Sequence, residues 1–186
     1  MDTSLYLPQL EAKLRAVGAL QPAAWQQIIA DLQMVILKPE QHFIRIEGSF
    51  AYVAVGILKE CDAKNRKQPS VINFIATNEP FVTRKLNKAN YLVACTKSIV
   101  FYWNLNTLQN LYQEFRELKH SYDILCAEYD ASIELRQLIL EAEIPEKIIL
   151  FTHHFKSLRF ILLKKDIANY LHISYTHYVS ISNNRP

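Results

Sequence analysis

The sequence predicts an α+β protein in which two helices precede an antiparallel β-barrel or sandwich and further helices follow it. Between residues 34 and 103, short runs rich in Val, Ile, Phe and Tyr are separated by turn-forming segments, with no helical pattern between them. After Trp103 the apolar residues recur at helical spacing. The chain has 186 residues, of which 50% are hydrophobic, so it can bury the core of one domain or of two small ones.

The first helical region covers residues 4–33 and is interrupted at Gly18, with Leu5, Leu10 and Leu14 on one side. The second helix is expected to begin at Gln21-Pro22, because proline is favoured in the first turn. Strands are predicted near residues 34–37, 42–46, 50–60, 70–76, 91–95 and 98–103.

A long helix is predicted from Asn104 or Asn106, either of which can cap it, to about Glu143. Apolar residues alternate along it at steps of four and three: Leu111, Phe115, Leu118, Tyr122, Leu125 and Tyr129. This seven-residue repeat predicts a homodimer interface over residues 108–136. The alternative is a helix that lies on the barrel, and the two are compatible if opposite faces are used. A second apolar stripe consists of Ile124, Ala131, Leu135 and Leu138.

The last quarter of the chain has helix-turn-helix spacing, with helices expected at about 145–156, 164–171 and 175–183. Each position has a role in the motif: inner face (Ile167, Leu171), close helix crossing (Ala168), turn (Ile173), N-cap (Ser174) and return to the core (Tyr178, Ile181). Residues 144–186 also hold six basic and two acidic side chains, whereas residues 1–143 hold 15 and 16. An ordinary helical hairpin with a solvated surface is the alternative interpretation.

On these residues the chain resembles the Crp/Fnr family of bacterial transcription regulators, in the short type that ends just after the recognition helix. The resemblance lies in Glu146-Lys147-Ile148 followed by Phe151, in Lys165-Asp166-Ile167-Ala168-Asn169-Tyr170-Leu171, and in a barrel segment at residues 52–59. It implies a cyclic-nucleotide-binding-like jelly roll with its N-terminal helices at 1–106, a dimerisation helix at 107–143 and a DNA-binding domain at 144–186. The implied function is that of a dimeric DNA-binding regulator.

The residues expected to contact DNA are Lys164, Lys165, Ser174, Tyr175, Thr176, His177, Ser180, Asn183, Asn184 and Arg185. Two departures weaken this expectation. Ser180 and Ser182 stand where the family usually places arginines, and serine replaces neither the guanine contact nor the phosphate contact of arginine. The alternative function is therefore a ligand-sensing or protein-interaction module whose helix-turn-helix no longer binds DNA specifically. His172 also replaces the usual turn glycine and must accept a positive φ.

The nucleotide pocket also departs from the family pattern. Family members that bind a cyclic nucleotide use Gly-Glu and an arginine about ten residues later, whereas this chain has Asn78-Glu79-Pro80-Phe81 and Ala89. Glu79, Arg84 and Lys88 are the nearby residues expected to contact a ligand if one binds, and Glu79 is more readily a capping carboxylate. We therefore expect no tight binding of cyclic AMP or cyclic GMP and no other cofactor, while an unknown small-molecule effector stays open.

Other functional classes find little support. No nucleophile elbow or metal-ligand spacing occurs, so neither an enzyme nor a metal site is predicted. Three glycines exclude a glycine-rich phosphate loop, and three scattered cysteines indicate reduced thiols in a cytoplasmic protein. The net charge of +3 excludes a polybasic protein, and no apolar run is long enough for a membrane span.

Overall fold

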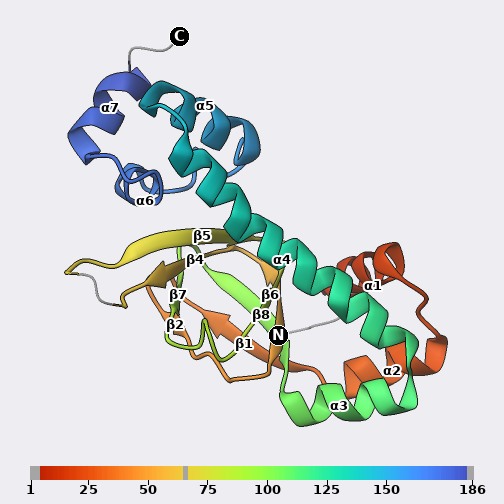
Figure 1. The fold of residues 1–186 in the computed structure, drawn as a ribbon. Helices are drawn as coiled ribbons and strands as arrows, with labels where there is room; N and C mark the ends of the chain where they lie inside the picture. Colours follow the sequence, from red (N-terminus) through yellow and green to blue (C-terminus); the bar gives the residue numbers. More distant parts are fainter. Residues whose placement is uncertain (1–4, 65–66, 184–186) are drawn as a thin grey trace.

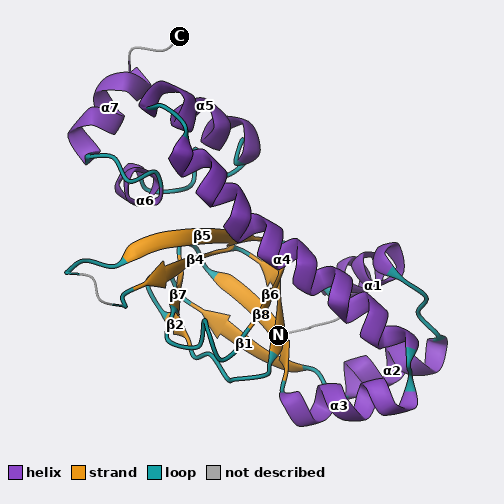
Figure 2. Ribbon diagram, viewed as in Figure 1, coloured by secondary structure: helices purple, strands orange, loops and turns teal. Residues whose placement is uncertain are grey.

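The computed structural model describes residues 5–64 and 67–183 and consists of a β-barrel with helices at both ends (Figures 1 and 2). The N-terminal helices are α1 (Leu7–Val17) and α2 (Pro22–Ala30), separated at Gly18 as the sequence predicts. Pro22 occupies the first turn of α2, where its missing N–H costs nothing.

Eight strands form two four-stranded antiparallel sheets, which confirms the α+β class and the antiparallel barrel. The strands are β1 (Gln33–Leu37), β2 (His42–Phe43), β3 (Phe50–Val55), β4 (Ile57–Asp62), β5 (Ser70–Ala76), β6 (Pro80–Val82), β7 (Tyr91–Ala94) and β8 (Ser98–Trp103). Their order is β1-β8-β3-β6 in one sheet and β2-β7-β4-β5 in the other.

Two details of the strands differ from the prediction. The single strand expected at residues 50–60 is two strands, because the chain turns at Gly56 and passes from one sheet to the other. Gly56 has φ +96°, and a Cβ there would lie 2.6 Å from the Lys97 carbonyl oxygen, so only glycine fits. The short strand β6 lies where the sequence predicts only a turn. It begins with Pro80, and a proline argues against a strand in the sequence.

The long helix expected to end near Glu143 is also divided. Helix α3 (Leu105–Glu114) begins at Asn104, whose side chain accepts a hydrogen bond from the Thr107 amide, as predicted for the cap. The chain leaves helical geometry at Phe115, which has φ −124° and ψ 87°. Helix α4 (Glu117–Glu141) then runs along the barrel from the N-terminal helices to the C-terminal ones (Figure 1).

Three helices complete the fold at the far end of α4: α5 (Ile144–His154), α6 (Lys164–Tyr170) and α7 (Tyr175–Asn183). They lie close to the predicted segments. No helix in the described part of the chain has the length and apolar character needed to cross a membrane.

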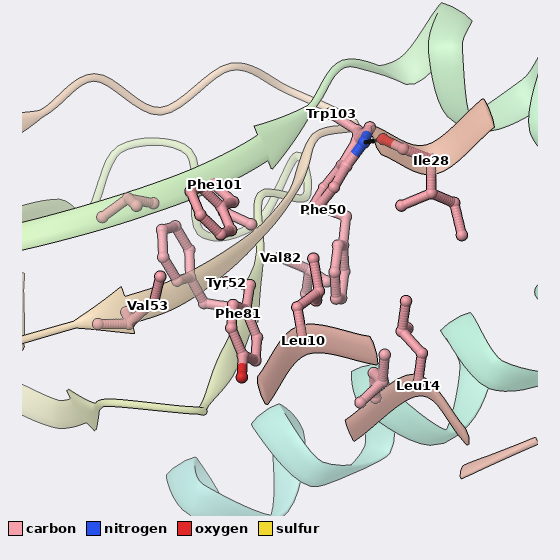
Figure 3. Packing of buried hydrophobic residues seen from close by; sticks show 14 of the residues in the cluster. Leu10, Leu14, Ile28, Phe50, Tyr52, Val53, Phe81, Val82, Phe101 and Trp103 are labelled. Atoms are coloured by element: carbon pink, nitrogen blue, oxygen red, sulfur yellow. Dashed lines mark hydrogen bonds between the residues drawn. The ribbon is translucent and has the colours of Figure 1, made fainter. Parts of the chain in front are cut away.

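The buried side chains form two clusters. The first joins the barrel interior to α1, α2, α3 and the first half of α4, and Figure 3 shows its centre around Phe50, Tyr52 and Phe81. The second joins the outer side of β4 and β5 to α5, α6 and α7 through residues such as Phe74 and Phe151.

The expected dimer seam belongs to the first cluster, which corrects its role. Leu111, Phe115, Leu118, Leu125 and Tyr129 are buried within this one chain, and the half-buried Tyr122 packs against the same cluster. They pack on the barrel and the N-terminal helices, so they do not leave an apolar stripe for a second copy to cover. The alternative of a helix lying on the barrel therefore describes this face of α4.

Candidate nucleic-acid interface

Helices α6 and α7 form the helix-turn-helix, and its turn has the geometry that the sequence predicts. The Ser174 side chain accepts a hydrogen bond from the His177 amide at 3.2 Å, which caps α7. His172 has φ +54°, the left-handed conformation that its place in the turn requires. The Ile173 amide donates to the Ala168 carbonyl at 3.0 Å and closes the turn.

The inner face of the motif is well packed. Ile167 and Leu171 are fully buried, Ala168 is 1% exposed where the helices cross, and Tyr178 of α7 is buried against them. These residues occupy the positions predicted for the core face, so the spacing found in the sequence is that of a packed motif.

The outer face presents a polar surface with two cations at its edge. The residues predicted to contact DNA that are exposed here are Lys164, Lys165, Ser174, Tyr175, Thr176, His177 and Ser180. The first two begin α6 and the last five span α7 and its cap, so one surface brings them together. Asn183 ends α7, whereas Asn184 and Arg185 lie outside the described residues.

Polar contacts attach the helix-turn-helix to the outer face of the barrel. Lys59 Nζ of β4 lies 2.8 Å from Asp166 Oδ2 of α6, and both side chains are about 90% buried, with 10% and 11% exposed. Burial alone would lower the pKa of Lys59, but the hydrogen bond and the charge of Asp166 outweigh it and raise that pKa. The Val71 amide donates to Asn169 Oδ1 at 2.7 Å.

Helix α4 contributes a third contact. Arg136 donates to the Tyr170 carbonyl at 3.1 Å and to Ser70 Oγ at 3.0 Å, and its guanidinium lies 2.8 Å from His172 Nε2. It therefore joins α4, β5 and the turn of the motif. Neither Lys59 nor Arg136 is predicted from the sequence as a functional residue, since the only local signal is a charged residue within an apolar strand or helix.

The three candidate ligand residues do not form a common site. Glu79 accepts a hydrogen bond from the Ala76 amide at 2.7 Å, which is the capping role expected for it. Arg84 pairs with Asp130 of α4 at 2.8 Å, and this hydrogen bond raises the pKa of the guanidinium. Lys88 pairs with Glu47 at 2.7 Å. Each is thus engaged in a different local contact.

A buried polar network fills the space between the barrel interior and α4. Arg45 lies 2.7 Å from Glu60, and the two side chains are 2% and 0% exposed. Tyr129 of α4 donates to Glu60 at 2.6 Å, and Asn90 donates to it at 3.0 Å. The Glu60 carboxylate is therefore paired with one cation and two further hydrogen-bond donors.

Comparison with known proteins shows which solved structures share this fold. No family model and no curated protein matches the sequence. Among solved structures, a putative transcriptional regulator of the Crp/Fnr family from Eubacterium rectale has a TM-score of 0.68 at 12% identity, covering 88% of this chain and 82% of its own. The c-di-GMP responsive global regulator CLP of Xanthomonas campestris has a TM-score of 0.67 at 11% identity, with coverage of 88% and 90%.

A cyclic nucleotide-binding domain containing protein from Listeria monocytogenes matches over 94% of this chain and 89% of its own, with a TM-score of 0.65 and 12% identity. The likeness extends over most of each chain. The protein therefore has the fold of the Crp/Fnr-type regulators, as the resemblance in sequence implies, and at this level of identity the likeness concerns the fold.

Proposed function

We propose that the protein is a homodimeric, non-enzymatic DNA-binding transcription regulator of the Crp/Fnr type that acts in the cytoplasm. The observation that carries the proposal is the capped, exposed helix α7, which follows α6 in a packed helix-turn-helix. The matching fold of known regulators supports it. In this fold residues 1–106 would be the sensor, 107–143 the dimerisation segment and 144–186 the DNA-binding domain.

Helix α7 would enter the major groove with its exposed polar side chains. Thr176, His177 and Ser180 would face base edges, with Asn183 and Asn184 beyond them. Ser174 and Tyr175 at the start of α7, together with Lys164, Lys165 and Arg185, would contact the phosphate backbone.

The affinity for DNA should be modest, because few cations per subunit can release counterions, and its salt dependence should be shallow. Replacing Ser180 and Ser182 by arginine should strengthen binding, since each arginine can restore a contact of about 1–3 kcal/mol. Fluorescence anisotropy with random and genomic upstream duplexes at two salt concentrations tests this. Loss of all binding at low salt in both proteins would refute a DNA-binding role.

A homodimer would form through the face of α4 that points away from the barrel. Ile124, Ala131 and Leu138 follow one another at seven-residue intervals, with Ala127 between the first two. Ala127 and Ala131 are exposed, and Leu138 is 64% exposed, so this stripe stays open after the other face has packed. The two alanines permit close approach of two helices, and a twofold contact is the commonest arrangement for such a face.

Ala131→Glu and Leu138→Glu should convert the dimer to monomers in sedimentation velocity, because like charges would meet on the twofold axis. The matched control is Ile44→Glu. Ile44 is also exposed, at 81%, but it lies on the segment between β2 and β3 and not on α4. The control should stay dimeric. A monomeric unmodified protein at micromolar concentration contradicts the proposed assembly.

We further propose that neither cyclic AMP nor cyclic GMP is an effector. Ala89 provides no cation for the cyclic phosphate, and Arg84 is held by Asp130. Calorimetry should show no binding of either nucleotide at low micromolar concentration, whereas a small-molecule effector of another class would suit the fold.

One observation favours a second function, a sensing or interaction module in which the helix-turn-helix serves as a scaffold. Helix α6 is an integral part of the second hydrophobic cluster and is joined to β4 by the buried pair of Lys59 and Asp166. With serines at 180 and 182, the helix-turn-helix would still pack against the barrel after it had lost the ability to bind DNA. The anisotropy experiment distinguishes the two functions.

A further inference from the structure

The segment between α5 and α6, in the C-terminal group of helices (Figure 1), exposes three large apolar side chains within four positions. Phe160 is 80% exposed, Ile161 53% and Leu163 49%. Leu158 and Leu162 are buried instead, at 9% and 5% exposure, and they lie one turn apart because the Leu162 amide donates to the Leu158 carbonyl at 3.0 Å. The turn therefore directs its two leucines to the core and leaves Phe160, Ile161 and Leu163 in solvent. We call these three residues the apolar tip.

Positive charge surrounds the apolar tip. Exposed cations lie on both sides of it in the sequence: Lys156, Arg159, Lys164 and Lys165. From residue 147 to residue 165 the chain contains five basic residues and no acidic one. The guanidinium carbon of Arg159 lies 4.4 Å from the centroid of the Phe160 ring, so a cation and the most exposed aromatic side chain are held together. This surface is therefore both apolar and positively charged.

The proposed DNA contact explains only part of this surface. Phosphates would pair with its lysines, but a duplex backbone offers no apolar area to three exposed side chains. Leu86 provides a comparison within the molecule, because it is 96% exposed while the nearby Arg84 and Lys88 are each paired with a carboxylate. In the described part of the chain no carboxylate pairs with Lys156 or Arg159. The apolar tip thus differs from other exposed apolar residues in having cations that are open to an anionic partner.

We propose that the apolar tip and its flanking cations form a docking surface for a lipid bilayer that contains anionic lipids. The three apolar side chains would enter the boundary between headgroups and acyl chains, while the long lysine and arginine side chains reach back to the lipid phosphates. The negative potential of such a bilayer attracts each cation. A single acidic protein segment would meet the cations of one side, whereas a lipid surface meets those of both sides at once. This is a surface contact and needs no membrane-spanning helix.

The inference goes beyond the proposed function, and its test needs no DNA. The full chain is sedimented with vesicles made of phosphatidylcholine and phosphatidylglycerol in equal parts, and with vesicles of phosphatidylcholine alone. Half-saturation at millimolar lipid is expected with the anionic vesicles, because one buried acyl chain gives a binding constant of about 10⁴ M⁻¹ and the apolar tip buries less. Binding should be much weaker to the neutral vesicles and should fall in high salt.

Two variants examine the two properties of the surface separately. Phe160→Ser combined with Ile161→Ser should weaken binding to the anionic vesicles at least tenfold, because the apolar area that the bilayer buries is lost. Lys156→Gln should weaken it about fivefold, the effect of one basic residue near an anionic surface. The matched control is Leu86→Ser, which removes an equally exposed apolar side chain from the barrel and should bind as the unmodified protein does.

Thermal denaturation should give the same midpoint for all these proteins, because every changed side chain is exposed. Absence of binding to the anionic vesicles overturns the proposal, and so does equal binding by the double variant. Equal binding to the neutral vesicles overturns the role of the cations. Binding to poly-L-glutamate that needs Phe160, without binding to vesicles, would assign the surface to an acidic protein instead.

Discussion

Lys59 and Glu60 are neighbours in β4, yet they serve opposite faces of the same sheet. Because side chains alternate along a strand, Lys59 points outward to α6 and Glu60 points inward to α4. Each is a buried charge paired with an opposite charge, which is Asp166 of α6 for Lys59 and Arg45 of the barrel for Glu60. The two pairs differ in the number of groups that bond to the charge and in how far the charge is shielded from solvent.

Glu60 is the more densely bonded of the two. Arg45, Asn90 and Tyr129 all bond to its carboxylate, which is 0% exposed. Within the described residues Lys59 has one direct ion-pair partner, Asp166, and the pair keeps about a tenth of its surface in solvent. The inner charge is therefore part of the barrel itself, whereas the outer charge attaches a separate group of helices. Removing the inner pair should damage the whole fold, and removing the outer pair should damage the attachment.

The largest effect is expected for Arg45→Ala. It leaves Glu60 buried without its cation, and breaking such a pair costs about 3–5 kcal/mol of unfolding free energy. Urea denaturation followed by circular dichroism measures the loss. If the variant does not fold, the milder Arg45→Lys should still show a lower midpoint, because it keeps the charge but not the second guanidinium nitrogen, which donates to the Val82 carbonyl at 3.0 Å. An unchanged midpoint in both would contradict the importance of the inner pair.

Asp166→Ala should come next, at about 3 kcal/mol, the lower end for a buried pair because this one is partly solvated. Hydrogen exchange should show loss of protection in α6 while β4 and β5 stay protected. The double variant Lys59→Met with Asp166→Leu is the control, since replacing both charges by apolar groups is often neutral. Equal loss of protection throughout the barrel would mean that the attachment is not a separate unit.

The same pair predicts a dependence on alkaline pH. The native pKa of Lys59 is raised, so the pair contributes its full stability below the unfolded-state lysine pKa of about 10.4 and loses it as the pH rises through the native pKa. The difference in unfolding free energy between the unmodified protein and Lys59→Met should therefore be constant near neutrality and shrink in alkali. A difference that grows with pH would have the wrong sign.

Tyr129→Phe should have a smaller effect, about 2 kcal/mol. It removes the hydrogen bond that the tyrosine hydroxyl donates to Glu60, whose carboxylate keeps two other partners, and the bond that this hydroxyl accepts from Asn87 Nδ2 at 3.1 Å. The matched variant Tyr122→Phe affects a tyrosine of the same helix whose hydroxyl does not contact Glu60. Thermal denaturation of the two variants should separate them by several degrees.

Arg84→Ala should have the smallest effect, less than about 1 kcal/mol, because the Arg84 and Asp130 side chains are 44% and 46% exposed. The effect should also vanish in high salt. A loss as large as that of Arg45→Ala would show that burial does not determine how much each ion pair contributes to the unfolding free energy.

Local patterns predicted much of the architecture. The asparagine cap at 104, the serine cap at 174 and the small residue at 168 act within a few positions of the chain, so their signals survive in any context that permits a helix. The strand segments are likewise set by short apolar runs between turns. For the same reason the residue spacing predicts the helix-turn-helix, although it leaves an ordinary helical hairpin as the alternative.

Such local patterns do not show which other parts of the fold these elements pack against. The spacing of Leu118, Leu125 and Tyr129 identifies an apolar face of a helix. Packing against the barrel buries this face as well as packing against a second copy of the chain would. Only the folded chain shows that the barrel covers it and that the stripe with Ala131 stays open.

The sequence by itself thus determined where most of the helices, strands and caps lie, because those depend on neighbours within one or two turns. The tertiary structure decided which faces meet. Lys59 is 107 residues from Asp166, and Glu60 is 69 residues from Tyr129. No periodicity connects positions so far apart, and a charged residue in a strand is equally compatible with solvent or with a buried partner. Only the packing of the barrel against its helices brings Asp166 to Lys59 and Tyr129 to Glu60.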